Sequence, residues 1–103
     1  MNTQFDHLSS QLAALCRQQH IRKLSLFGSA ARGEMGPNSD VDLLVEFEQG
    51  YAPSLAGFGR LKNLFANVLE APSIDLATPS ILRNPYRRKA ILADLKELYA
   101  ARG

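Results

Sequence analysis

The strongest constraint on the fold is an uninterrupted apolar run, Leu43, Leu44 and Val45, inside the segment 41–48. A strand with one face in water alternates apolar and polar residues, whereas a strand buried on both faces carries a continuous apolar run. A strand of the second kind needs other elements packed on both of its faces. We therefore expect segment 41–48 to be a central strand of a layered α/β or α+β domain.

Helical and strand patterns alternate along the rest of the chain. Phe5, Leu8, Leu12 and Leu15 recur at helical spacing and form one apolar stripe. The predicted elements, in chain order, are a helix over 3–19, a strand over 21–27, a short helix near 30–33, a strand over 41–48, a helix over 55–69, a strand over 73–77 and a helix over 85–100. The expected order is thus α-β-α-β-α-β-α, with turns over 34–39 and 49–54.

Composition narrows the class of protein. The chain has 103 residues, which predicts one domain over 1–103. Its 12 basic and 10 acidic residues give a net charge of +2, far from that of a chain built mainly to bind nucleic acid. No apolar run approaches the ~20 residues of a membrane span, and residues 1–10 do not resemble a secretory signal. The single cysteine, Cys16, is expected to be a small core residue, so a cytoplasmic protein is the simplest interpretation.

Gly28 and Ser29 lie between a predicted strand and a predicted helix. Glycine lets a ligand approach the backbone closely, and the free N–H groups of a helix start favour a phosphate. The Ser29 hydroxyl adds a donor. Taken alone this is a weak signal, because Gly-Ser turns are common.

Three acidic residues provide a second signal. Asp40 and Asp42 are two residues apart at the start of the central strand, so both side chains point to the same face. Two carboxylates this close repel each other unless a cation lies between them, and Mg²⁺ is bound by one or two carboxylates together with substrate phosphates. Asp75 lies inside a short apolar strand, where an acid is costly unless it is paired or bound to metal. If the two strands are neighbours, Asp75 joins the other two carboxylates.

Together these residues resemble the nucleotidyltransferase fold shared with DNA polymerase beta, whose signature is Gly-Ser, ten residues and then Asp-x-Asp. Here Gly28 and Ser29 are followed by residues 30–39 and then by Asp40-Val41-Asp42. The sequence is most similar to the minimal nucleotidyltransferases, which are antitoxin partners of HEPN-domain toxins in prokaryotes. Segments 32–34, 43–47 and 74–79 also match that pattern, so the resemblance covers essentially the whole chain.

The resemblance implies a small mixed β-sheet flanked by helices, with the three carboxylates at one end. It implies that Asp40, Asp42 and Asp75 hold two Mg²⁺ ions, with Asp75 also helping to activate the incoming hydroxyl. It further implies that Gly28 and Ser29 hold the terminal phosphates of ATP. Arg32 is expected either to touch phosphates or to pair with Glu34. The implied reaction is two-metal in-line transfer of AMP from ATP to a tyrosine of the HEPN toxin, within a hetero-oligomer.

Two alternative functions, and the role of one basic cluster, stay open. The chain could neutralise a toxin by binding it without catalysis, or transfer a nucleotide to a small molecule or an RNA end. Four basic residues gather around the start of the last predicted helix: Arg83, Arg87, Arg88 and Lys89. They suit a solvated face, or contact with the nucleotide or with an acidic toxin surface. Direct nucleic-acid binding is not expected, because no aromatic residues are spaced as a stacking platform.

Overall fold

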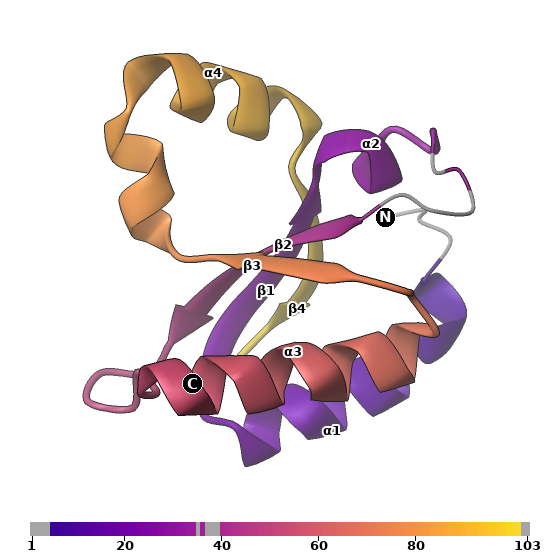
Figure 1. Ribbon diagram of the computed structural model, residues 1–103, viewed down its shortest axis with the longest axis vertical. Coiled ribbons are helices and arrows are strands. Elements are labelled where there is room, and N and C mark those ends of the chain that lie inside the picture. The colour runs from indigo at the N-terminus through magenta and orange to yellow at the C-terminus, as the bar shows by residue number, and fades with distance from the viewer. Residues whose placement is uncertain (1–4, 35, 37–39, 102–103) are drawn as a thin grey trace.

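A four-stranded sheet in the order β3-β2-β1-β4 forms the middle of the molecule in the computed structural model, which describes residues 5–34, 36 and 40–101 (Figure 1). The strands are β1 (Ile21–Phe27), β2 (Val41–Phe47), β3 (Ile74–Ala77) and β4 (Lys96–Ala100). β1 is antiparallel to β2 and β4, whereas β3 is parallel to β2. The sheet is therefore mixed, and the predicted fold class is confirmed.

Helices cover this sheet in two groups. The helix α1 (Ser9–Gln18), which follows the 3-10 turn η1 (Asp6–Leu8), lies beside α3 (Leu55–Leu69) on one face (Figure 1). The short helix α2 (Gly28–Ala31), the 3-10 turn η2 (Pro79–Arg83) and α4 (Pro85–Asp94) lie toward the other side of the sheet. No helix among the described residues is long and apolar enough to cross a bilayer.

The apolar run in β2 is buried on both faces, as predicted. Leu43 and Val45 belong to the main core, which the sheet forms with α1 and α3. Leu44 belongs to a second, smaller core with Phe27 of β1 and Ile91 of α4. Successive side chains of a strand point to opposite faces, so β2 contributes to both cores and must lie inside the sheet.

The prediction of one helix over 85–100 is wrong in its second half. Helix α4 starts at Pro85 after the Asn84 cap, as expected, but it ends at Asp94, and Leu95 is already extended. Residues 96–100 form β4, in which Lys96 pairs with Leu26 of β1. The free edge of β1 supplies backbone hydrogen-bond partners, and this gain outweighs the helical spacing of a short apolar pattern. The element order therefore ends in a helix and a strand.

The other predicted boundaries differ less. The helix expected over 3–19 is a 3-10 turn followed by α1, and residues 1–4 lie outside the described ones. The short helix near 30–33 begins earlier, at Gly28. Of the turn expected over 34–39, residues 35 and 37–39 also lie outside the described part.

Cys16 is fully buried in the main core, as expected, and burial raises the pKa of its thiol to about 12. The thiolate is the reactive form, so the native thiol is expected to react about 10²- to 10³-fold more slowly than an exposed one near pH 8. Reaction with a disulfide reagent in native buffer and in denaturant measures this ratio. Equal rates in the two conditions would show that Cys16 is accessible.

Candidate active site

The three predicted acidic residues lie at one end of the sheet and on one face. Asp42 and Asp75 face each other in the parallel register of β2 and β3, and Asp40 comes directly before β2. Val41 and Ile74, which are also paired in this register, are buried in the main core. By strand alternation, Asp42 and Asp75 point to the opposite face, where α4 lies. The sheet thus brings Asp75 to the Asp40–Asp42 pair, as predicted.

The negative charges of Asp75 and Asp40 act on Asp42. The pKa of Asp42 is raised, first by burial and then by the negative charges of Asp75 and Asp40. The positive charges of Arg32 and Arg87 oppose this shift. Burial removes part of the water around Asp42, and the other two acidic residues add negative charge near it. Both effects disfavour the ionised form of Asp42, and a bound cation would offset them.

Gly28 brings the backbone of the β1–α2 turn directly against the Asp42 side chain. Its φ is +71°, a left-handed conformation that favours glycine. A Cβ added at this position would lie 2.3 Å from Oδ2 of Asp42. Phe27, the residue before Gly28, is paired with Asp42 in the sheet. The turn and the carboxylate therefore form one site, a contact that the sequence alone did not predict.

Ser29 follows in the first turn of α2 and is half-buried. Its carbonyl oxygen accepts hydrogen bonds from the backbone N–H groups of Arg32 and Glu34, which closes this short turn. The sequence motif is thus placed next to the carboxylates. The phosphate-binding role of Gly28 and Ser29 stays a prediction.

Arg32 lies beside this site but is held by two carboxylates. Its Nε donates to Oε1 of Glu34 at 2.9 Å, and its Nη1 donates to Oδ2 of Asp94 at 2.5 Å. These two hydrogen bonds raise the pKa of Arg32 above its ordinary value. Pairing with Glu34 was one of the two expectations, but Asp94, which joins the α2 turn to α4, was not anticipated. A contact between Arg32 and a phosphate stays a prediction.

The donor set fits Mg²⁺ as a metal shared with substrate. Among the described residues, no three His, Cys, Asp or Glu side chains are already arranged as a group that could hold an ion. Mg²⁺ does not require such a group, because it is usually bound by one or two carboxylates and completed by waters and substrate phosphates. Asp40 and Asp42, next to the close backbone approach at Gly28, could offer those carboxylates.

The raised pKa of Asp42 predicts a pH-dependent effect on stability. An acid whose folded pKa lies above its unfolded value favours folding only while it is protonated, so its contribution falls as pH rises from the ordinary pKa through the raised one. Without bound metal, Asp42→Asn is therefore expected to melt at a higher temperature than wild type near pH 7, with the difference shrinking toward about pH 3. Thermal unfolding in chelator across this range measures it. A variant that melts lower than wild type at neutral pH would contradict the assignment.

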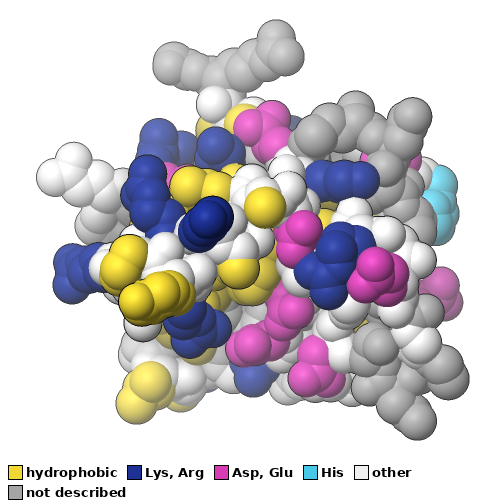
Figure 2. Space-filling model, turned by 90° about the horizontal axis from the view of Figure 1, so that it is seen from above, with side chains coloured by type: hydrophobic (Ala, Val, Ile, Leu, Met, Phe, Trp, Pro, Cys, Tyr) yellow, Lys and Arg dark blue, Asp and Glu magenta, His cyan; other side chains and the backbone are white. Residues whose placement is uncertain are grey.

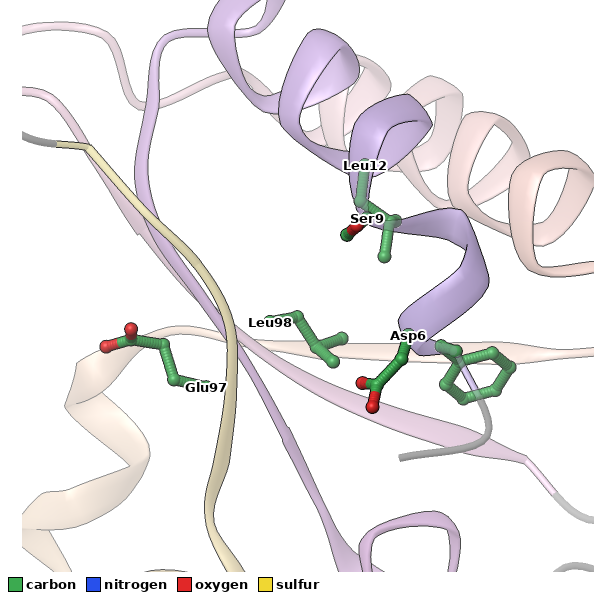
Figure 3. A pocket seen from close by; sticks show the side chains of 6 residues that line it. Asp6, Ser9, Leu12, Glu97 and Leu98 are labelled. Atoms are coloured by element: carbon green, nitrogen blue, oxygen red, sulfur yellow. The ribbon is translucent and has the colours of Figure 1, made fainter. Parts of the chain in front are cut away.

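A surface pocket lies away from the three carboxylates, on the other side of the sheet. It lies between the start of α1 and β4 (Figure 3) and is lined by Phe5, Asp6, Ser9, Leu12, Glu97 and Leu98. Leu12 and Leu98 belong to or pack against the main core, so this pocket is on the α1 side of the sheet. The carboxylate site is on the α4 side.

Comparison with known proteins assigns a family to this arrangement. The family model of the nucleotidyltransferase domain matches residues 8–98 of this chain. A candidate protein adenylyltransferase of Methanocaldococcus jannaschii, MJ1379, is 37% identical over 75 residues, which cover 73% of this chain and 74% of that protein. The protein adenylyltransferase MntA of Thermococcus cleftensis is 39% identical over 64 residues, 62% of each protein.

Solved structures show the same fold. A structure described as a candidate minimal nucleotidyltransferase has a TM-score of 0.67 and 31% identity, and covers 85% of this chain and 86% of that one. A toxin–antitoxin crystal structure with AMP-PNP has a TM-score of 0.68 at 21% identity, covering 91% and 74% of the two chains. A tri-AMPylated HEPN toxin from Shewanella oneidensis in complex with its MNT antitoxin aligns with a TM-score of 0.61 at 18% identity, covering 92% and 71%.

Proposed function

The chain belongs to the nucleotidyltransferase domain family, and we propose that it transfers AMP from ATP to a tyrosine of a HEPN toxin and thereby acts as the antitoxin. The observation that carries this proposal is the contact between the Gly28 backbone position and Asp42, which faces Asp75 in the sheet. A backbone turn that would suit phosphates thus lies beside carboxylates that would suit a metal, and this supports the proposal. The adenylyltransferase relatives and the toxin–antitoxin structures support the choice of reaction and partner.

In this proposal the acceptor tyrosine oxygen attacks the α-phosphorus of ATP. A new O–P bond forms, the bond from the α-phosphorus to the bridging oxygen breaks, and pyrophosphate leaves with that oxygen. Asp40 and Asp42 hold Mg²⁺, with Asp75 as a further ligand, and Gly28 and Ser29 hold the terminal phosphates. When bound, the two ions supply the positive charge that stabilises the entering and leaving oxygens. Asp75 helps to take the proton from the acceptor hydroxyl.

The exposed surface of α4 suits a protein as the acceptor. Tyr86 is 86% exposed and Leu92 is 44% exposed, although both are large apolar side chains. Helix α4 lies on the carboxylate side of the sheet, because its Ile91 packs on Phe27 and Leu44. A protein docked on this helix would bring its own residues close to the carboxylates. Non-catalytic toxin binding would use the same surface, so the experiment must separate the two.

The test uses the purified chain, Mg²⁺, a HEPN-domain protein from the same organism and ATP labelled either at the α- or at the γ-phosphate. We expect a labelled HEPN band on a denaturing gel with α-labelled ATP and none with γ-labelled ATP, and no band with the Asp40→Asn variant. Neutralisation of the toxin without any label would favour inhibition by binding alone. Labelled product in the absence of any partner protein would favour a small-molecule or RNA acceptor. Both of these results would overturn the proposed reaction.

A further inference from the structure

Helix α4 is anchored over the face of the sheet that carries the carboxylates. Ile91, its one buried residue, packs on Phe27 of β1 and on Leu44 of β2. Leu44 is two residues from Asp42 along β2 and therefore lies on the same face. The helix is also tied to the α2 turn, because Asp94 accepts the hydrogen bond from Arg32. Figure 1 shows α4 and α2 together at one end of the molecule.

Helical spacing divides α4 into two sides. Residues three and four apart lie on the same side of a helix, so Arg87, Ile91 and Asp94 share one side. Ile91 and Asp94 contact the sheet and the α2 turn, so Arg87 belongs to the side of α4 that faces this region. Arg87 is exposed, as are Tyr86, Lys89, Ala90 and Ala93, so it is the position of Arg87 one turn before Ile91 that places it on the sheet side. Figure 2 views the molecule from the end where α4 and α2 lie and shows basic side chains close to acidic ones on this face.

The charge of Arg87 acts on the carboxylate site. It lowers the pKa of Asp42, as does Arg32, and these are the two described cations that oppose the raised pKa of that acid. Their situations differ, because Arg32 is already hydrogen-bonded to Glu34 and Asp94. Within the described residues, no ion pair joins the Arg87 side chain to a carboxylate. Arg87 thus lies on the sheet-facing side of α4 and carries a charge that no described carboxylate pairs with.

We propose that Arg87 is a further nucleotide-binding residue, whose guanidinium binds the terminal phosphates of ATP. This inference rests on the proposed function and extends it. The terminal phosphates are assigned to Gly28 and Ser29, and Gly28 touches the same Asp42 on which Arg87 acts. When the α-phosphorus is transferred, the terminal phosphates leave as pyrophosphate and carry away the electron pair of the broken bond. A guanidinium forms paired, charge-assisted hydrogen bonds to phosphate oxygens, so Arg87 stabilises that leaving group.

The test measures the dissociation constants of ATP and of AMP, each with Mg²⁺, by titration calorimetry. Arg87→Ala is expected to weaken ATP binding by about 10- to 100-fold, the value of a lost charge-assisted contact, and AMP binding by less than about 3-fold. Arg87→Lys should restore part of the affinity, because it keeps the charge and loses the paired geometry. Arg88→Ala is the matched control, since it removes the same charge from the next position of α4. It should change both constants by less than about 3-fold.

Each result decides between outcomes. Selective loss of ATP affinity in Arg87→Ala, with Arg88→Ala close to wild type, supports a direct contact with the terminal phosphates. If Arg87→Ala and Arg88→Ala weaken ATP binding equally, Arg87 contributes only to the general surface charge, and the inference is overturned. Equal loss for ATP and AMP would place the contact elsewhere and also overturn it. If the wild-type protein binds neither nucleotide, the proposed function is wrong. If wild type and Arg87→Ala bind ATP equally well, only the inference about Arg87 is wrong.

Discussion

The Asp42→Asn variant is expected to transfer AMP at least about 10³-fold more slowly than wild type. Asp42 is the carboxylate that faces Asp75 across the sheet and touches the Gly28 position, so it joins the proposed metal ligands to the proposed phosphate site. Asparagine has nearly the same shape, but it removes the charge that holds a divalent cation. The rate of label transfer from α-labelled ATP to the HEPN protein, under single-turnover conditions, measures the effect.

A matched control separates the site from the fold. Glu46 lies on the same strand as Asp42, but its carboxylate pairs with Arg22 at 2.6 Å, away from the Gly28 turn. Glu46→Gln should therefore keep the transfer rate within about twofold of wild type, since a single ion pair with exposed partners contributes little. Binding of Asp42→Asn to the HEPN protein should also be retained. If Asp42→Asn transfers AMP at the wild-type rate, the assignment of the carboxylates is wrong.

Gly28→Ala is expected to have the second largest effect. The new Cβ would lie 2.3 Å from Oδ2 of Asp42, and alanine would have to adopt a φ of +71°. The side chain of Asp42 or the turn must shift, so we expect transfer to fall by at least about 10²-fold. The backbone strain should also lower the free energy of unfolding by about 1–3 kcal/mol. Transfer kinetics and denaturant unfolding of the same preparation measure the two effects.

The control for this substitution is Gly59→Ala. Gly59 lies in α3, and a Cβ added there would meet no atom within 4 Å. Alanine favours a helix over glycine, so this variant should be more stable by about 0.5–1 kcal/mol and equally active. Wild-type transfer by Gly28→Ala would show that the close approach at Asp42 is not needed for the reaction.

Much of this fold follows from local patterns. The continuous run at Leu43 and Leu44 predicts a strand between two layers, and the structure divides these two residues between two cores. The predicted bounds of β1 and α3 agree with the structure, because each segment is a single uninterrupted pattern. The end of the chain could not be predicted in the same way. In the segment from Leu95 to Tyr99 the short apolar pattern fits a helix, and only the free edge of β1, a distant partner, makes it a strand.

The candidate site shows the same division. The sequence alone was enough to select Asp40, Asp42 and Asp75. An acidic residue next to an apolar strand has an unfavourable burial energy unless it is paired or bound to a metal. Contacts between residues far apart in the chain could not be predicted from the sequence. The approach of Gly28 to Asp42 depends on strand pairing, and the bond from Arg32 to Asp94 depends on where α4 lies. Arg87 could be named only as one of four basic residues until the packing of Ile91 fixed its side of the helix.

The most direct test of the site is a crystal structure of the protein with Mg²⁺ and a non-hydrolysable ATP analogue. We predict metal density between Asp40 and Asp42 with Asp75 close by, and the terminal phosphates against Gly28 and Ser29 within reach of Arg87. A nucleotide bound elsewhere, or bound at this end with its triphosphate turned away from the carboxylates, would contradict the account.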